Sequence, residues 1–253
     1  FNTHNSELHE RMRAALVDWL VEATDEFSLS ATTLHLSVAL MDRVLSRQRV
    51  PLKALQLLGA TCLFMSAKLD EVECPTAEQI AEATADRFSP EDILEHELAV
   101  GNLLEFDVML PTRESFLPRF LLAAGANERE KHLAAFLSDV ALHDYRLAFH
   151  EPSMVAAAVV HLTRLMVRGG IAGGGEPAWN ASLQWHTGLG EDQVASVTRR
   201  LHWAHGELVS STLRAARKKF DTPRRCHVSL MPPMTERDMQ RSTAGGSGAG
   251  GVA

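Results

Sequence analysis

The 253-residue sequence contains few cysteines: Cys62, Cys74 and Cys226 lie far apart and form no CxxC pair. A disulfide scaffold needs an even set of cysteines at short spacings, so this class is excluded and a reducing compartment is favoured. Strand-like alternation of apolar and polar residues is also nearly absent. Helical periodicity runs along most of the chain, and we therefore expect an all-α protein.

The sequence also lacks a signal-peptide pattern and an uninterrupted apolar run of membrane-spanning length. Its longest apolar stretch, residues 54–69, contains Gln56, Ser66 and Lys68. The stretch is shorter than the roughly 20 apolar residues that a spanning helix needs. We therefore expect a soluble intracellular protein that does not contact a membrane.

Motifs of catalysis and cofactor binding are missing as well. The sequence has no HExxH, no phosphate-binding glycine loop after a strand and no nucleophile elbow. Among its twelve histidines, His202 and His205 share a helical face, but only Glu207 could join them as a metal ligand. Solvated or capping histidines are therefore favoured over a metal site. We expect no enzymatic activity, no cofactor and no metal.

The net charge of −7 is unevenly distributed. Residues 1–112 hold 8 Lys and Arg against 19 Asp and Glu, a balance of −11, and residues 113–253 hold 17 against 13, a balance of +4. The acidic first half disfavours nucleic acid and favours a basic protein partner. The second half carries a basic cluster over residues 214–225. A solvated helix end, a nuclear import signal and a docking surface for acidic groups remain open for it.

The helical periodicity falls into two series of five segments, separated by Leu110-Pro111-Thr112. In each series the third segment is the most apolar, as expected for a helix surrounded by others. The first series is expected near residues 8–27, 32–46, 52–68, 76–86 and 89–105. The second is expected near residues 113–124, 128–146, 153–168, 179–187 and 191–213. We predict two tandem five-helix domains, residues 1–112 and 113–234, with a Gly-rich loop at 168–175 and a disordered tail at 235–253.

Residues 12–22, MRAALVDWLVE, raise a question of packing. Their apolar side chains cover about 240° around a helix, although a helix packed on one core needs a stripe of roughly 100°. Arg13 lies within this arc, and an arginine in apolar surroundings must be paired. The rest of the arc, which includes Met12 and Trp19, is either additional core or a surface that binds a partner.

Several stretches resemble the cyclin box of A/B-type cyclins. They are MRAALVDWLVEATDEFSLSATTLHLSVALMDRVLS, LQLLGATCLFMSAKLDE and FDVMLPTRESFLPRFL in the first half, and EPSMVAAAVVHL and ARKKFDTPRRCHVSLMPP in the second. The resemblance covers about residues 8–233, and residues 106–117 look more A-type than B-type. It implies two five-helix cyclin folds. It also implies a regulatory subunit that binds and activates a cyclin-dependent Ser/Thr kinase in cell-cycle control, in the nucleus and cytoplasm.

The resemblance further implies where the kinase binds. In the family, a lysine at the end of the third helix and a glutamate in the fifth hydrogen-bond the backbone around the kinase's movable helix. Lys68 and Glu97 occupy these positions. The alternatives are that Lys68 only interacts with the dipole at the end of its helix and that Glu97 is an ordinary solvated carboxylate. The other residues expected at the interface are Met65, Leu69, Asp70, Glu71, Gly101 and Val108. Leu69, Asp70 and Gly101 depart from the family's usual residues, which predicts a weaker or different kinase contact.

The exposed part of the arc corresponds to a shallow groove in the family, which binds Arg-x-Leu-type motifs of substrates and inhibitors. An apolar floor accepts the leucine and a carboxylate accepts the arginine. The positions expected to form it are Met12, Ala15, Leu16, Trp19, Glu22, Leu55 and Gln56. Ala15 replaces a larger aliphatic residue, so a wider pocket is expected. The family also pairs the positions of Arg13 and Asp42 as a structural ion pair.

Two other functions remain open at this point. A cyclin-like scaffold could bind partners through the groove without activating a kinase, since residues 69, 70 and 101 are altered. Double cyclin folds also occur in general transcription factors, which would make the chain a nucleic-acid-binding protein. The −11 balance of the first half disfavours this last reading.

Overall fold

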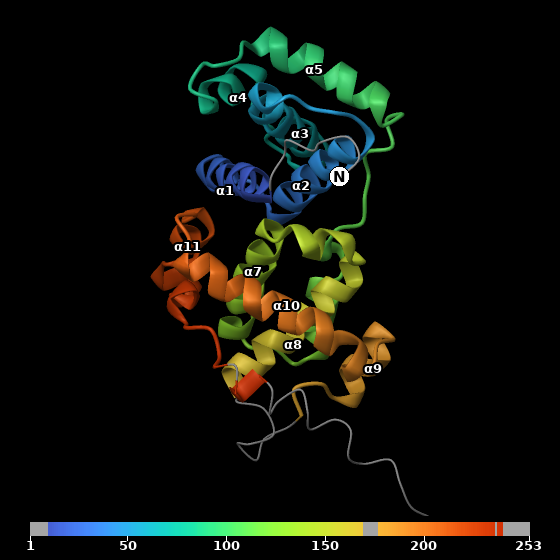
Figure 1. Ribbon diagram of the computed structural model, residues 1–253, viewed down its shortest axis with the longest axis vertical. Helices are drawn as coiled ribbons and strands as arrows, with labels where there is room; N and C mark the ends of the chain where they lie inside the picture. The colour runs from blue at the N-terminus through green and yellow to red at the C-terminus, as the bar shows by residue number, and fades with distance from the viewer. Residues whose placement is uncertain (1–9, 169–176, 236, 240–253) are drawn as a thin grey trace, which may run out of the picture. The chain divides into compact units, whose positions relative to one another are not determined.

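The computed structural model describes residues 10–168, 177–235 and 237–239, and helices are the only regular elements in these ranges. The chain divides into two compact units, Phe1–Glu114 and Ser115–Ala253, which we call the N-terminal and C-terminal units. Each unit is built around one apolar helix (Figure 1). The prediction of an all-α protein with two tandem five-helix folds is confirmed.

In its described residues, 10–114, the N-terminal unit holds five α-helices. They are α1 (Glu10–Glu26), α2 (Ala31–Arg47), α3 (Leu55–Asp70), α4 (Ala77–Ala83) and α5 (Pro90–Leu103), with a short 3-10 turn, η1 (Leu52–Ala54), before α3. Helix α3 contacts α1, α2, α4 and α5. Every residue of α3 from Leu58 to Ala67 is buried, so its lack of a polar face follows from its place at the centre of the unit.

Side-chain caps fix where α4 and α5 begin. Thr76 and Gln79 form a reciprocal capping box at the start of α4. Ser89 and Asp92 form another at the start of α5, with Pro90 at the first helical position. Each box satisfies two backbone N–H groups that a helix start otherwise leaves without partners. Both starts follow directly from their sequence patterns.

Within the described part of the chain, one helical segment is long and apolar enough to cross a membrane. It is Leu52–Asp70, which comprises η1 and α3, and most of it is buried inside the unit. Burial among α1, α2, α4 and α5 accounts for its composition, because a helix enclosed by others needs no polar face.

The C-terminal unit repeats this plan with additions. Its α-helices are α6 (Leu117–Ala123), α7 (Glu128–His143), α8 (Pro152–Arg168), α9 (Ala181–Thr187), α10 (Glu191–Ser210) and α11 (Ala215–Phe220). Short 3-10 turns are η2 (Arg113–Ser115), which joins the units in sequence, η3 (Tyr145–Phe149), η5 (Pro223–Arg225) and η6 (Val228–Leu230). The apolar α8 packs on α6, α7 and α10.

Several helix boundaries in this unit differ from the expectation by a few residues, and one helix is additional. The segment expected to run to Arg146 ends at His143, because the Asp144 carboxylate accepts hydrogen bonds from the backbone N–H groups of Arg146 and Leu147 and begins the turn η3. The helix α11 was not expected, since the second series was predicted to end near residue 213 and a solvated helix end was one of three interpretations left open for residues 214–225. Its buried Ala216 and Phe220 pack it onto the unit.

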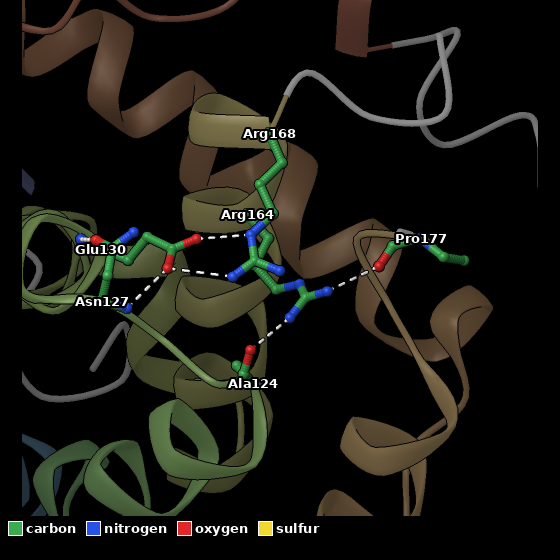
Figure 2. A network of polar contacts seen from close by, with 6 residues as sticks. All are labelled: Ala124, Asn127, Glu130, Arg164, Arg168 and Pro177. Carbon is green, nitrogen blue, oxygen red and sulfur yellow. Dashed lines mark hydrogen bonds and ion pairs between the residues drawn. The ribbon is translucent and has the colours of Figure 1, made fainter. Parts of the chain in front are cut away.

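The end of α8 is closed by a polar network (Figure 2). The Arg168 guanidinium binds both oxygens of Glu130 at 2.8 and 3.2 Å, and the backbone N–H of Asn127 donates to the same carboxylate at 2.9 Å. Arg164 donates to the backbone carbonyls of Ala124 at 2.7 Å and Pro177 at 3.0 Å. Burial alone would raise the pKa of Glu130, but these hydrogen bonds outweigh it and lower the pKa. The network keeps a buried carboxylate ionised.

Two predicted segments fall largely outside the described residues. The Gly-rich loop expected at 168–175 lies there apart from Arg168, and so does the expected tail beyond Met239. At the start of that tail, the Thr235 hydroxyl accepts from the backbone N–H of Asp238, and Met239 is buried. The first residues of the predicted tail therefore form a turn against the C-terminal unit.

Candidate functional site

The structure brings Lys68 and Glu97 together at one end of the N-terminal unit. Lys68 is in the last turn of α3, and its Nζ lies 2.6 Å from Oε1 of Glu97 on α5. Their side chains are 45% and 22% exposed, and the ammonium also lies over the Phe64 ring. The pair is accessible, so both groups can exchange their mutual contact for contacts with another protein.

Exposed apolar side chains occur on the same two helices as this ion pair. Leu94 and Leu98 are 48% and 59% exposed on α5, and with Glu97 and Gly101 they follow the spacing of one helical face. Leu69, at the end of α3, and Val72, just beyond it, are exposed too. Large exposed apolar side chains that cluster around polar groups indicate a protein-binding surface. Leu94, Leu98 and Val72 were missed by the sequence analysis, although the helical spacing from Glu97 could have found the first two.

Asp70 and Glu71 are bound within the unit instead of pointing freely to solvent. The backbone N–H of Ser30 donates to Oε1 of Glu71 at 2.6 Å, and the Ser30 hydroxyl donates to Asp70. The Thr33 hydroxyl lies 2.5 Å from the same Glu71 oxygen. The two carboxylates therefore join the end of α3 to the start of α2. Of the remaining predicted interface residues, Met65 is buried and Val108 is half-buried.

Gly101 gives space to an aromatic ring. A Cβ added there would lie 2.7 Å from Cε1 of Phe106, so the glycine allows that ring to lie directly on the helix. The chain reverses through left-handed conformations at Glu105 and Phe106, and the Phe106 N–H donates to the Gly101 carbonyl at 2.8 Å. The ring is 63% exposed. Phe106 thus supplies the exposed apolar surface that Gly101, which has no side chain, cannot supply. The sequence alone did not predict this position of the Phe106 ring.

The residues predicted to form a groove lie on α1 and at the start of α3. Ala15 and Glu22 are exposed, Met12 is 37% exposed and Trp19 is partly exposed, so this face of α1 is not simply core. Leu16 and Leu55 are buried, as a floor would be, and Gln56 accepts a hydrogen bond from Arg87 at 3.2 Å.

A glycine allows the close approach of α1 and α3. A Cβ added to Gly59 would lie 2.9 Å from Cδ1 of Leu16, closer than real Cβ contacts come. The two helices can therefore meet tightly beneath the face that carries Met12 and Trp19. This places the apolar floor directly on the central helix.

Arg13 and Asp42 form a two-pronged ion pair between α1 and α2. Nε of Arg13 lies 2.7 Å from Oδ1 of Asp42, and Nη2 lies 2.7 Å from Oδ2. The arginine is 1% exposed. Two parallel hydrogen bonds to a carboxylate offset the free energy that a guanidinium loses when it is removed from water. The arginine within the apolar arc is paired.

The described residues contain no group of three or more His, Cys, Asp or Glu side chains that could hold a metal ion. His202 directs Nε2 to the carbonyl of Met234 at 2.9 Å. His205 is fully buried against Phe136, and burial lowers its pKa to about 4. Burial raises the pKa of the Cys62 thiol well above its usual range, which leaves that cysteine without nucleophilic character.

Comparisons with known proteins agree with this architecture. The chain matches the family models of the cyclin N-terminal domain over residues 1–109 and the cyclin C-terminal domain over residues 111–234. Cyclin-B2-1 of Arabidopsis thaliana is 36% identical over 216 residues, which cover 85% of this chain and 49% of the relative. The G2/mitotic-specific cyclin S13-7 of Glycine max is 34% identical, covering 90% of this chain and 86% of the relative. The chain spans about half the length of several of these relatives.

Solved structures show the same fold. A viral cyclin from herpesvirus saimiri superposes with a TM-score of 0.67 at 20% identity, over 79% of this chain and 88% of that one. Two tandem helical units, each built around one apolar helix, define a cyclin-fold protein. The chain belongs to the cyclin family.

The expected likeness to A-type cyclins is not supported. Four of its relatives, two from Arabidopsis thaliana named Cyclin-B2-1 and Cyclin-B2-2 and two named Cyclin-B1-3, are B-type cyclins by name. Residues 106–117, on which that expectation rested, form a short stretch, whereas the identity to B-type relatives extends over most of the chain. Similarity over the full fold outweighs a local pattern of twelve residues.

Proposed function

We propose that this chain is the regulatory subunit of a cyclin-dependent Ser/Thr kinase, of the B-type mitotic class. The observation that carries the proposal is the Lys68–Glu97 pair on a face of exposed leucines. Cyclins named for G2 and mitosis are among its relatives, which supports the assignment to mitotic cell-cycle control. We expect the complex to act in the nucleus and cytoplasm.

The chain would activate its kinase by binding alone. In a kinase, the lysine that holds the ATP phosphates must pair with a glutamate on a movable helix. A surface that binds this helix in its active orientation shifts the kinase toward the active state, because it binds that state better. Lys68 and Glu97 supply one cation and one carboxylate for exposed backbone groups of the helix, and Leu94 and Leu98 supply apolar area. The phosphoryl-transfer chemistry belongs to the kinase.

Substrate recruitment would use the groove on α1. Met12 and Trp19 offer partly exposed apolar surface for the leucine of an Arg-x-Leu motif, and Glu22 offers an exposed carboxylate for its arginine. Ala15 leaves more space than a larger aliphatic residue would. We expect the groove to bind such motifs weakly and to tolerate a larger apolar side chain at the leucine position.

The test is phosphorylation of a histone-type substrate by purified monomeric cyclin-dependent kinases, with and without this chain. Stimulation by the wild type that the Lys68→Ala/Glu97→Ala variant loses is the expected result. The matched control is Glu128→Ala/Lys131→Ala, which removes another exposed ion pair, at 2.7 Å on α7, and should leave stimulation intact.

Two other outcomes would contradict the proposal. A folded chain that stimulates none of several such kinases but binds a labelled Arg-x-Leu peptide would be a scaffold without activating function. A folded chain that binds duplex DNA at moderate salt and leaves the kinases unaffected would be a nucleic-acid-binding protein.

A further inference from the structure

The short helices α6 and α9 lie side by side in the C-terminal unit. Nη2 of Arg119 on α6 lies 3.1 Å from Nδ1 of His186 on α9. One turn further along α6, the carbonyl of Ala123 accepts a hydrogen bond from the Ser182 hydroxyl of α9 at 3.1 Å. Because the residue numbers rise along α6 while they fall along α9, the two contacts define an antiparallel pair of helices.

One side of this helix pair is exposed and apolar. Leu122 on α6 and Trp185 on α9 are 71% and 84% exposed. Each directly precedes a residue that bridges the two helices, and equivalent positions of an antiparallel pair lie on the same side of the line of contact. Pro118 and Ala181, each one turn before them, are exposed as well. We call these four residues the α6/α9 face.

The charge of these two helices differs from that of the whole chain. Neither α6 nor α9 contains an acidic residue, although the net charge of the chain is −7. Arg119 is exposed, and within the described part of the chain its side chain interacts with His186 alone. The other N–H groups of its guanidinium are therefore available to a ligand.

Trp185 adds a second available donor beside Arg119. Its indole N–H has no hydrogen-bond partner among the residues that the structure describes. Tryptophan and arginine are the residues that most often dominate the binding energy of protein interfaces. Both available groups are donors and one of them is positively charged, so a complementary surface must supply acceptors, of which carboxylates bind a guanidinium best.

We propose that the α6/α9 face binds an amphipathic acidic helix of a partner protein. Apolar side chains of that helix, three and four residues apart, would cover Leu122 and Trp185. An Asp or Glu beside them would accept hydrogen bonds from Arg119. The face belongs to the C-terminal unit and shares no residue with the predicted kinase interface or the α1 groove, so this proposal goes beyond the proposed function.

A helix fits this face better than an extended peptide does. An extended peptide gains affinity from main-chain hydrogen bonds to the edge of a sheet, whereas α6 and α9 use their backbone groups within the helices. Two neighbouring helices present ridges of side chains, into which the ridges of a third helix can pack. The positive charge of Arg119 disfavours a basic helix.

Selection from a phage-displayed library of 16-residue peptides tests the proposal with the whole chain. The library is first depleted on the Leu122→Ser/Trp185→Ser variant, which lacks the apolar side chains of the face, and the remaining phage are then bound to the wild type. We expect the enriched peptides to carry Asp or Glu beside Leu, Ile or Phe at spacings of three and four residues. Labelled synthetic copies of these peptides are then titrated by fluorescence anisotropy.

The titration compares variants of the face with a matched control. Leu122→Ser/Trp185→Ser should weaken binding of the selected peptides at least tenfold. Phe149→Ser/Leu230→Ser removes two other exposed apolar side chains of the same unit, 67% and 58% exposed, and should change affinity less than twofold. Circular dichroism verifies that each variant is folded.

A second comparison tests the charge. Arg119→Gln should weaken binding of the acidic peptides at least threefold, because it removes the cation beside the apolar face. Arg199→Gln, which removes another exposed arginine of the same unit, should leave their affinity unchanged.

Four results would overturn the proposal. They are a selection without enriched peptides, enriched peptides without acidic residues, equal weakening by the two double variants, and equal weakening by the two arginine variants. Sedimentation equilibrium of the chain alone adds a fifth. Self-association of the wild type that Leu122→Ser/Trp185→Ser abolishes would assign the face to a second copy of this chain.

Discussion

The two units end their central helices in opposite ways. In the N-terminal unit, the last turn of α3 carries Lys68, whose partner Glu97 lies on α5 beside exposed leucines. In the C-terminal unit, α8 ends at Arg168, whose partner Glu130 is 1% exposed and also caps α7. Both ends contain a cation and a carboxylate, but one pair remains available to a partner and the other is used within the unit. The fold is repeated, but only the N-terminal unit leaves the ion pair at the end of its central helix exposed.

The largest expected effect is on the buried pair of the N-terminal unit. Asp42→Ala leaves the Arg13 guanidinium buried without its carboxylate, so we expect the free energy of unfolding to fall by about 3–5 kcal/mol. Urea denaturation followed by circular dichroism measures the change. Glu82→Ala, an exposed carboxylate of the same unit, should change stability by less than about 0.5 kcal/mol. An equally small effect of Asp42→Ala would mean that the pair does not stabilise the unit.

The second-largest expected effect is a loss of stability at acidic pH that originates in the C-terminal unit. The pKa of His205 in the folded C-terminal unit is lowered to about 4 by burial and by the nearby His202 and Arg217, against about 6.5 in an unfolded chain. Because the unfolded state then binds the proton more readily, this group's contribution is fully present above pH 6.5. It is lost as the pH falls toward 4.

When the pH is lowered from 7 to 5, the contribution of His205 to the free energy of unfolding should fall by about 2 kcal/mol. His205→Phe keeps a ring against Phe136 and removes the titration. Unfolding free energies of the variant at the two pH values should therefore differ by about 2 kcal/mol less than those of the wild type. An unchanged pH dependence would show that His205 does not control acid stability.

The third prediction compares one variant at each of the two helix ends. Lys68→Ala should reduce kinase affinity about tenfold, roughly 1.4 kcal/mol, and leave stability nearly unchanged because the side chain is 45% exposed. Arg168→Ala should do the reverse and lower unfolding free energy by about 2 kcal/mol, since it leaves the buried Glu130 with one partner fewer. Kinase titration by calorimetry and urea denaturation separate the two effects. If both variants lost affinity equally, the contrast between the helix ends would be wrong.

The smallest effect concerns the ring on Gly101. Phe106→Ala removes exposed apolar surface, and we expect kinase affinity to fall about fivefold, roughly 1 kcal/mol. Gly101→Leu/Phe106→Ala puts a side chain on the helix itself and should recover most of this loss. Calorimetric titration compares both variants with the wild type. Full affinity of Phe106→Ala would place the ring outside the interface.

Much of the fold could be predicted from the sequence because its signals are local. The capping boxes at Thr76 and Ser89 mark the helix starts, and the apolar character of α3 predicts its central place. That Arg13 needs a partner also follows from its neighbours alone. The choice of Asp42 came from the resemblance to cyclins, since nothing local joins positions 29 residues apart.

The remaining features depend on contacts that no local pattern records. The position of the Phe106 ring requires left-handed backbone at Glu105 and Phe106, neither of which is a residue type that favours it. The binding of Asp70 and Glu71 to the start of α2 joins segments about 40 residues apart. The ion pair of Lys219, in the basic cluster, with Asp139 joins α11 to a different helix. Tertiary packing decides each of these.

The contact between Gly59 and Leu16 gives the proposed peptide-binding surface a control point that lies beneath its exposed residues. A Cβ at position 59 would lie 2.9 Å from Cδ1 of Leu16, so the Leu16 side chain would have to move. The shape of the proposed groove floor would change while every exposed residue of that face stayed the same. Substrate choice in such a protein can therefore be retuned during evolution from behind the binding surface, by a position that an inspection of ligand contacts would overlook.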